Sequence, residues 1–283
     1  MPTRSPSRTR AAVARSLPDL AAALAGRGDV ALVPTMGALH DGHRALLRAA
    51  RAAAPTVVMS LFVNPAQFGP GEDFARYPRD EGADVAIAED EGADVVFAPD
   101  VATMYPPGFA TTVDPGPLGD QLEGQARPGH FRGVATVVTR LFGLVRPQSA
   151  FFGEKDYQQL TVVRSVVRDL ALGVEIVGVP TVRDADGLAL SSRNRYLSPA
   201  EREQATALPA ALMTAGELYA AGERDGSRLT AAARARLPFE PDYLELRRRA
   251  DLGAYDPADP AILLVAARIG TTRLIDNIPV EDA

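Results

Sequence analysis

Long apolar runs alternate with polar, glycine-containing turns and helix-forming stretches through the first two thirds of the chain. The runs lack polar alternation, which is typical of parallel strands buried on both faces of a sheet. Five such strands are predicted, at 29–34, 56–63, 94–98, 149–152 and 174–182. The helices predicted with them cover 18–26, 42–54, 80–91 and 134–145, and a further helix ends near 171. This alternation predicts an α/β fold with a Rossmann-like, doubly wound parallel sheet.

The pattern changes after residue 183. Ser198 and Glu201 match the N-cap and third position of a capping box, which begins a helix. The predicted elements of this part are helices at 199–221 and 227–236, a strand at 242–246, and a hairpin at 262–267 and 272–278 that turns at Gly270. We therefore predict two domains, residues 1–183 with the parallel sheet and residues 184–283 as a smaller α+β domain. The arginine-rich first 16 residues are expected to be a frayed terminus.

Composition excludes several classes of protein. The chain has 283 residues, of which 46% are hydrophobic, and a formal net charge of −6. No apolar run approaches the roughly 20 residues needed to cross a bilayer, which argues against a membrane protein. The acidic balance argues against nucleic acid as a partner. Because the chain has no cysteine, disulfides and thiol chemistry are excluded and a cytoplasmic location is expected.

The most informative stretch is residues 34–43, Pro-Thr-Met-Gly-Ala-Leu-His-Asp-Gly-His. It follows the first apolar strand and leads into an Ala/Leu/Arg-rich helix. A strand, a glycine-containing turn and a helix place free backbone N–H groups and the positive end of a helix beside a phosphate. Two of the three histidines of the chain, His40 and His43, lie within this one turn.

Three interpretations of the two imidazoles are open from the residues alone. They can be ordinary polar residues of a turn. They can bind a metal, although His-x-x-His without cysteine or a nearby third histidine offers few ligands. They can also donate hydrogen bonds to phosphates and stabilise charge as a phosphoryl centre is attacked. His-x-Gly-His in this position resembles the signature of the nucleotidylyltransferase superfamily. The choice among the three interpretations depends on motifs elsewhere in the chain.

Further polar side chains follow other predicted strands. Asn64 and Gln67 come directly after the second strand, in a Gly- and Pro-rich loop at 64–77 that we expect to form a mobile flap. Lys155 follows the fourth strand and is the only lysine among 30 basic residues, which favours a site that requires a compact ammonium over a chance survivor on a solvated surface. Asparagine is also rare, and occurs at Asn64, Asn194 and Asn277. No Walker A or Gly-x-Gly-x-x-Gly pattern supports a P-loop or dinucleotide site.

Five ordered motifs together resemble the pantoate–β-alanine ligase (pantothenate synthetase) family. They are Pro-Thr-Met-Gly-Ala-Leu-His-Asp-Gly-His (34–43), Phe-Val-Asn-Pro-x-Gln-Phe (62–68), Leu-Glu-Gly-x-x-Arg-Pro-Gly-His-Phe (122–131), Phe-Gly-Glu-Lys-Asp-Tyr-Gln-Gln (152–159) and Ser-Ser-Arg-Asn (191–194). The resemblance extends over about residues 17–280. The departures, an arginine-rich N-terminal extension and Arg247-Arg-Arg249, touch no motif.

The resemblance implies a reaction in two steps. The carboxylate of (R)-pantoate would attack the α-phosphate of ATP, giving pantoyl adenylate and pyrophosphate. The amine of β-alanine would then attack the activated carbonyl, giving pantothenate and AMP. The family also implies Mg²⁺ carried by the ATP phosphates, with no separate protein metal site, and a homodimer.

The resemblance also implies a role for each matching segment. His43 is the strongest catalytic candidate, joined by His40, Lys155 and Arg193. The residues expected to bind ATP are Met36, Gly37, Ala38, Leu39, His40, Asp41, Gly42, His43, Gly153, Glu154, Lys155, Asp156, Val182, Leu190, Ser191, Ser192 and Arg193. Pantoate is expected at Gln67, Gln159 and Asn64, and β-alanine at Gln67. The weaker candidates are Tyr77, Glu123 and Arg127.

Two other functions remain to be weighed. Another nucleotidylyltransferase, such as one that makes a dinucleotide cofactor, would share the His-x-Gly-His turn but not the paired glutamines. A non-catalytic nucleotide-binding or regulatory module is the alternative from outside the enzymes. Pyrophosphate exchange with pantoate would separate these functions from the ligase.

Overall fold

The computed structural model describes residues 10–281, so most of the arginine-rich extension lies outside the described residues. The chain divides into two compact units. The first runs to Pro115 and adds Arg127–Phe152 and Val163–Val179, and the second consists of Gly116–Ala126, Gly153–Val162 and the chain from Pro180 onward. The domain division at residue 183 stays a prediction; two short segments that precede it group with the second unit.

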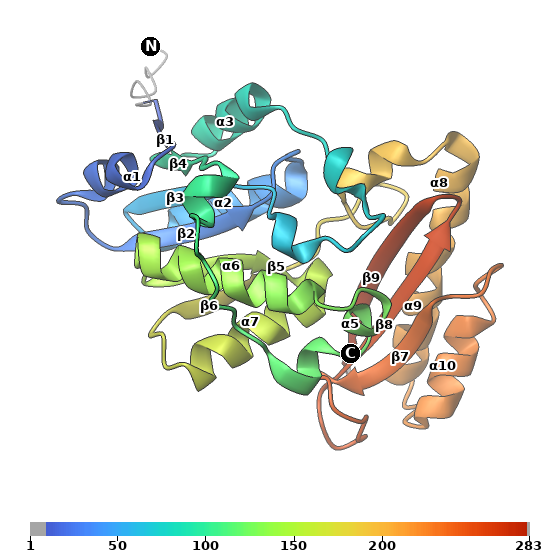
Figure 1. Cartoon of the computed structure of the whole chain (residues 1–283). Coiled ribbons are helices and arrows are strands. Elements are labelled where there is room, and N and C mark those ends of the chain that lie inside the picture. The colour runs from blue at the N-terminus through green and yellow to red at the C-terminus, as the bar shows by residue number, and fades with distance from the viewer. Residues whose placement is uncertain (1–9, 282–283) are drawn as a thin grey trace, which may run out of the picture. The chain divides into compact units, whose positions relative to one another are not determined.

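A six-stranded sheet in the order β1-β4-β3-β2-β5-β6 organises the first unit (Figure 1). Its strands are β1 (Ala12–Ala14), β2 (Val30–Thr35), β3 (Thr56–Leu61), β4 (Val95–Phe97), β5 (Ser149–Gly153) and β6 (Glu175–Val179). β2 pairs in parallel with both β3 and β5, and β4 pairs in parallel with β1 and β3. The predicted doubly wound parallel sheet is confirmed.

Helices cover both faces of this sheet. They are α1 (Leu17–Leu24), α2 (Asp41–Ala53), α3 (Glu81–Asp90), α4 (Val101–Met104), α6 (His130–Val145) and α7 (Tyr157–Asp169). Right-handed crossovers place α2 and α3 on one face and α6 and α7 on the other (Figure 1). On the α2 face, Leu47 and Ala50 are fully buried with strand residues Val33, Val57 and Val96.

The order of the strands places a topological switch point between β2 and β5. The chain runs from β2 to β3 and β4 in one direction, and from β5 to β6 in the other. Ligands of open α/β sheets bind at the carboxyl ends of strands beside such a point. The turn with His40 and His43 follows β2, and the segment with Lys155 follows β5.

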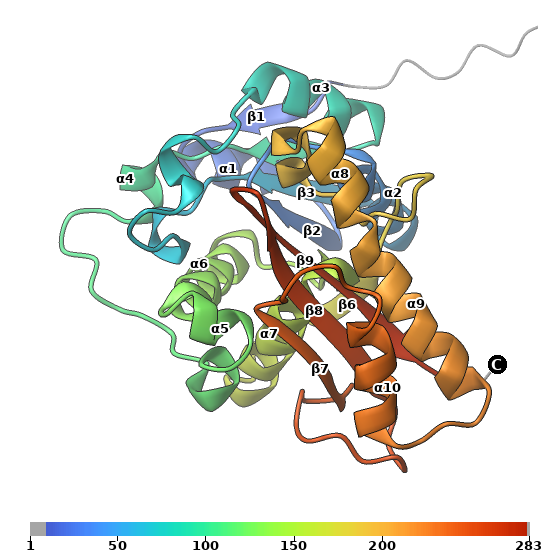
Figure 2. The same ribbon diagram turned by 90° about the vertical axis from the view of Figure 1, so that its right-hand side faces the viewer.

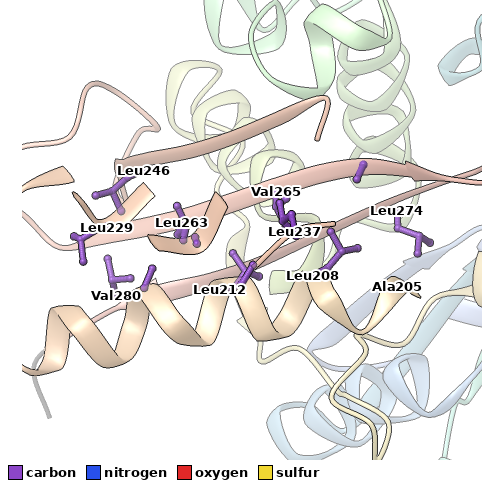
Figure 3. Packing of buried hydrophobic residues seen from close by; sticks show 14 of the residues in the cluster. Ala205, Leu208, Leu212, Leu229, Leu237, Leu246, Leu263, Val265, Leu274 and Val280 are labelled. Carbon is purple, nitrogen blue, oxygen red and sulfur yellow. The ribbon is translucent and has the colours of Figure 1, made fainter. Parts of the chain in front are cut away.

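The second unit contains an antiparallel sheet, β7-β8-β9, with helices packed on it (Figure 2). Its elements are α8 (Pro199–Ala205), α9 (Ala207–Ala220), α10 (Gly226–Arg234), β7 (Tyr243–Arg248), β8 (Ala261–Ile269) and β9 (Thr272–Val280). Figure 3 shows Leu208 and Leu212 of α9 on the side chains of the sheet, with Leu263 and Val265 of β8 in the same buried cluster. The predicted hairpin is therefore confirmed as β8 and β9.

Several segments that the sequence predicts as loops contain short helices. They are α5 (Glu123–Ala126) and the 3₁₀ turns η1 (Pro65–Gln67), η2 (Asp73–Ala75), η3 (Gly116–Gly119), η4 (Glu154–Asp156) and η5 (Ser192–Tyr196). The helix predicted over 199–221 is two helices separated at Thr206. Pro209 explains this break, because it lacks the N–H that a continuous helix would use. The last parallel strand stops at Val179, and Pro180 follows it.

Candidate active site

The turn after β2 is held by a buried carboxylate from α3. Gly37 and Ala38 both have positive φ angles, 85° and 54°. Their turn points the N–H groups of Ala38 and Leu39 at Asp84, whose two carboxylate oxygens accept them at 2.9 and 2.8 Å. A Cβ on residue 37 would lie 2.7 Å from Asp84 Oδ2, so this close approach requires glycine. Asp84, only 3% exposed, thus fixes the turn that precedes the histidines.

His40 and His43 form the N-terminal cap of α2. His40 Nδ1 accepts a hydrogen bond from the N–H of Gly42 at 3.2 Å, and His43 Nδ1 accepts one from the N–H of His40 at 3.3 Å. The ring centroids lie 4.2 Å apart. Because each Nδ1 accepts, each neutral ring carries its proton on Nε2. Both imidazoles are therefore set as Nε2–H donors at the positive end of a helix.

Gln67 lies in η1, and its side chain is held from two directions. Its amide nitrogen donates to Met36 Sδ at 3.1 Å, and its amide oxygen accepts from Asn64 Nδ2 at 3.0 Å. Asn64 Nδ2 also donates to the carbonyl of Gly133, and Asn64 Oδ1 accepts from the Tyr105 hydroxyl at 2.7 Å. Burial raises the pKa of Tyr105 to about 12, so the hydroxyl stays a donor at neutral pH. The structure brings Met36, Asn64 and Gln67 together as one polar cluster.

A second network holds the backbone of Gln67. Its carbonyl accepts from His130 Nδ1 at 2.8 Å, and Arg127 donates to His130 Nε2 at 3.1 Å. Since guanidinium can only donate, His130 is a neutral ring with its proton on Nδ1. Arg127 also forms a two-bond ion pair with Glu72, at 2.8 and 2.7 Å. Burial alone would raise the pKa of Glu72, but Arg127 outweighs it and holds that pKa below the ordinary 4.5.

In the second unit, Lys155 lies in η4, the turn that follows β5. Its side chain is 18% exposed, and Nζ lies 3.8 Å from Asp156 Oδ1, which is an ion pair without a hydrogen bond. The carbonyls of Glu154 and Lys155 both accept from the side chain of Asn277 on β9. The backbone that carries the lysine is therefore tied to the antiparallel sheet.

The segment from Val182 to Arg193 forms a compact loop of the same unit. The N–H of Leu190 donates to the carbonyl of Val182 at 2.9 Å, which closes the loop. Ser191 caps η5 by accepting the N–H of Arg193 at 3.2 Å. Asn194 Nδ2 donates to the carbonyl of Ala189 at 3.0 Å. These hydrogen bonds hold residues 190–193 in an ordered turn.

The weaker candidates have clear packing partners. Tyr77 is buried, and its ring makes an edge-to-face contact with Phe68, with the ring centroids 5.9 Å apart. Glu123 accepts from the Tyr243 hydroxyl at 2.9 Å and forms an ion pair with Arg273. Of the adjacent glutamines, Gln159 is partly exposed, whereas Gln158 is buried and bonds the backbone of the 116–126 segment. These contacts give Tyr77 and Glu123 structural roles.

Four residues organise these clusters without a role predicted from the sequence: Asp84 and Glu72, which lie in no motif, and His130 and Asn277, for which no contact is predicted. Each acts on a backbone group or a charge far away in the sequence. His130 is one of only three histidines and Asn277 one of only three asparagines, but these counts do not indicate which groups the two side chains contact. For Asp84, the only signal in the sequence is its place in a predicted helix that is expected to pack on the parallel sheet.

A family model described as pantoate-beta-alanine ligase matches residues 8–279. This match spans nearly the whole chain and both compact units. The chain belongs to the pantoate–β-alanine ligase family. A pantothenate synthetase of Rhizorhabdus wittichii is 58% identical over 261 residues, covering 90% of this chain and 92% of that protein. The Roseiflexus castenholzii protein of the same name is 54% identical, with 92% and 96% covered.

Solved structures of pantoate–β-alanine ligases share the fold. The pantothenate synthetase of Thermus thermophilus aligns with a TM-score of 0.90 at 51% identity, covering 95% of this chain and 99% of that one. A pantoate-beta-alanine ligase of Francisella tularensis, described as complexed with beta-gamma ATP and β-alanine, aligns with a TM-score of 0.80 at 30% identity, covering 96% and 99%. Among the described residues of this chain, no helix has both the length and the apolar character of a membrane span.

Proposed function

We propose that the protein condenses (R)-pantoate with β-alanine to pantothenate at the expense of ATP, which is converted to AMP and pyrophosphate. Membership of the pantoate–β-alanine ligase family supports this activity. The relative from Francisella tularensis, whose structure is described with beta-gamma ATP and β-alanine, supports the two co-substrates. The five sequence motifs all lie in ordered segments of the described chain.

The reaction proceeds through an adenylate in this proposal. An oxygen of the pantoate carboxylate forms a bond to the α-phosphorus of ATP, and the bond from that phosphorus to the β,γ-phosphates breaks. Pyrophosphate leaves with the electron pair. The amine of β-alanine then attacks the acyl carbon, AMP leaves, and the amine loses a proton. Activation is needed because a free carboxylate has no adequate leaving group for an amine to displace.

The hydrogen bonds of the two histidines are the observation that carries this proposal. His40 Nδ1 and His43 Nδ1 both accept from the backbone, so both Nε2 atoms carry protons without any need for a positive ring. Two neutral donors at a helix N-terminus suit phosphate oxygens that gain charge in the transition state. His43 is the principal catalytic residue in this proposal, and His40 assists it.

The remaining site residues either supply positive charge to ATP or bind the substrates. Lys155 and Arg193 supply positive charge to the triphosphate, and residues 36–43, 153–156, Val182 and 190–193 bind ATP. Gln67, Gln159 and Asn64 bind the polar groups of pantoate, and Gln67 also meets β-alanine. For Gln67, the hydrogen bonds to Met36 and Asn64 support this role. They hold the side-chain amide in place, and a ligand could replace either of these partners.

Mg²⁺ is proposed to arrive with ATP. Among residues 10–281, no group of three or more His, Asp or Glu side chains could hold a metal by itself. Mg²⁺ commonly keeps several waters and is bound through substrate phosphates, which it neutralises. A homodimer and a cytoplasmic location are proposed by analogy with the family.

Pyrophosphate exchange tests the proposal. With pantoate and Mg-ATP but no β-alanine, labelled pyrophosphate should enter ATP, because the first half-reaction is reversible. Omission of pantoate is the control, and other small hydroxy acids test selectivity. Exchange that requires β-alanine would contradict the adenylate mechanism. Absence of exchange together with absence of pantothenate formation would contradict the ligase activity itself.

A further inference from the structure

The rare asparagine Asn277 contacts the turn that carries the only lysine. Its Nδ2 donates to the carbonyl of Glu154 at 3.0 Å and to the carbonyl of Lys155 at 2.8 Å. Two carbonyl oxygens can only accept, so the amide nitrogen must be the atom that faces them. One side chain of β9 therefore holds two consecutive peptide groups of η4.

Asn277 is itself fixed by an ion pair between the buried Asp276 and the partly exposed Arg183. The Asn277 N–H donates to Asp276 Oδ1 at 2.8 Å, and Arg183 binds both oxygens of that carboxylate at 2.7 and 2.9 Å. Arg183 also donates to the Asn277 carbonyl at 3.1 Å. Asp276 is 3% exposed and Asn277 is 5% exposed. Buried polar groups that are hydrogen-bonded in this way hold their geometry firmly.

The same network reaches the loop that carries Arg193. Arg183 donates to the carbonyl of Gly187 at 3.1 Å and pairs with Ala189 through a β-bridge. Strand β9 contacts both η4 and η5. All of these residues belong to the second unit. A single buried network thus orders both segments that are expected to meet the phosphates of ATP.

We propose that Asn277 is a positioning residue that acts through Lys155. The inference rests on the proposed function of Lys155 in binding the triphosphate. A lysine side chain is a flexible stem with four carbons, so its ammonium is placed well only if its backbone is fixed. Asn277 supplies this fixation through the carbonyl of Lys155 and that of the residue before it.

The first test is the substitution Asn277→Ala, with Asn277→Ser as a second variant that keeps a polar group too short to reach both carbonyls. Each should lower the rate of pantoate-dependent pyrophosphate exchange by about tenfold, because Lys155 would then be held less precisely against the triphosphate. Thermal unfolding identifies which variant is folded. If Asn277→Ala does not fold, the rate of Asn277→Ser decides.

The control is Val280→Ala on the same strand. Val280 is 1% exposed in the hydrophobic core of the second unit and has no part in the site. Its truncation should lower the melting temperature but leave the exchange rate near that of the parent. If this control loses exchange as strongly as Asn277→Ala does, the effect of Asn277 is general destabilisation and the inference fails.

A double-mutant cycle with Lys155→Ala tests whether Asn277 acts through Lys155 or affects ATP binding independently of it. The dissociation constant of a non-hydrolysable ATP analogue is measured for the parent, both single variants and the double variant. We expect Asn277→Ala to weaken binding in the parent but to have little further effect in Lys155→Ala. An undiminished effect in the double variant, or parent-like behaviour of both Asn277 variants, would overturn the inference. Exchange by the parent protein reports separately on the proposed function.

Discussion

The Nδ1 atom of His43 accepts the backbone N–H of His40 at 3.3 Å, so one histidine of the turn orients the other. His40 in turn accepts from Gly42, and Asp84 holds the two residues before His40. This orientation requires no ligand, because the hydrogen-bond donor to each imidazole is a backbone N–H group. Catalysis by pre-oriented donors depends on such fixation, since no reorganisation is then needed during the reaction.

The first prediction is that His43→Ala lowers the adenylation rate by about 10²–10³-fold, or about 3–4 kcal/mol. The substitution removes the Nε2–H donor, little buried surface and one capping hydrogen bond of α2, so the melting temperature should fall by only a few degrees. Pyrophosphate exchange measures the rate, and thermal unfolding is the control. Near-normal exchange by a folded His43→Ala protein would leave the turn with a structural role only.

Much of the fold could be predicted because its signals are local. Continuous apolar runs predict the buried strands β2 to β5 and also β6, of which only Val179 is buried. The capping box at Ser198 is present, with its hydroxyl accepting the N–H of Glu201 at 3.3 Å. Strand β1 has no comparable signal. It has three residues, Ala12–Ala14, and it is a strand because the edge of β4 is available to it. Short edge strands depend on tertiary pairing more than on their own sequence.

The candidate site could be predicted only in part, for a similar reason. Residues that follow a strand closely, such as His40, Gln67 and Lys155, could be predicted as site residues because the apolar run of the preceding strand is recognisable in the sequence. Their supports are distant in the sequence: Asp84 lies 46 residues from Ala38, and Asn277 lies 122 residues from Lys155. No spacing rule connects such pairs. Their contacts arise only when the chain has folded.

The second prediction concerns the flap at residues 64–77. This loop contains η1 and η2 and an aromatic contact between Phe68 and Phe74. We expect it to close over substrates, because exclusion of water protects an adenylate from hydrolysis. Hydrogen exchange of its amides should slow when pantoate and a non-hydrolysable ATP analogue bind, while α9 in the second unit serves as the reference. An unchanged rate throughout 64–77 would remove the lid hypothesis.

The third prediction uses the ion pair of Glu72 with Arg127. Because the pKa of Glu72 is lowered in the folded protein, its stabilisation is present above the ordinary value of 4.5 and is lost as pH falls through the lowered value. Glu72→Gln should therefore cost about 1 kcal/mol near pH 7, a modest amount because the pair is partly exposed and screened. The difference should shrink in strongly acidic solution. Unfolding of parent and variant across this range tests it, and a constant difference would contradict the pair's role.

The fourth prediction compares two glycines of α6. A Cβ on Gly133 would lie 2.2 Å from the carbonyl oxygen of Ala66, whereas a Cβ on Gly143 would meet nothing within 4 Å. Gly133→Ala should therefore push α6 away from η1, which carries Gln67, and destabilise the fold by about 2–3 kcal/mol. Gly143→Ala should be neutral or slightly stabilising, because alanine favours helix. Equal melting temperatures for the two variants would show that the close approach is not needed.

The last prediction concerns the geometry of the lone lysine. Lys155 is 18% exposed, and its backbone is tied to Asn277, so little room or freedom remains for a longer and wider side chain. Ammonium can turn three donors toward phosphate oxygens, whereas guanidinium imposes a planar fork. Lys155→Arg, although it keeps the charge, should lose pyrophosphate exchange nearly as severely as Lys155→Ala, with both melting temperatures close to the parent's. Arg168→Lys at an exposed position of α7 is the matched control and should change neither quantity. If Lys155→Arg retains most of its exchange rate, positive charge alone suffices there, and the scarcity of lysine has no functional meaning.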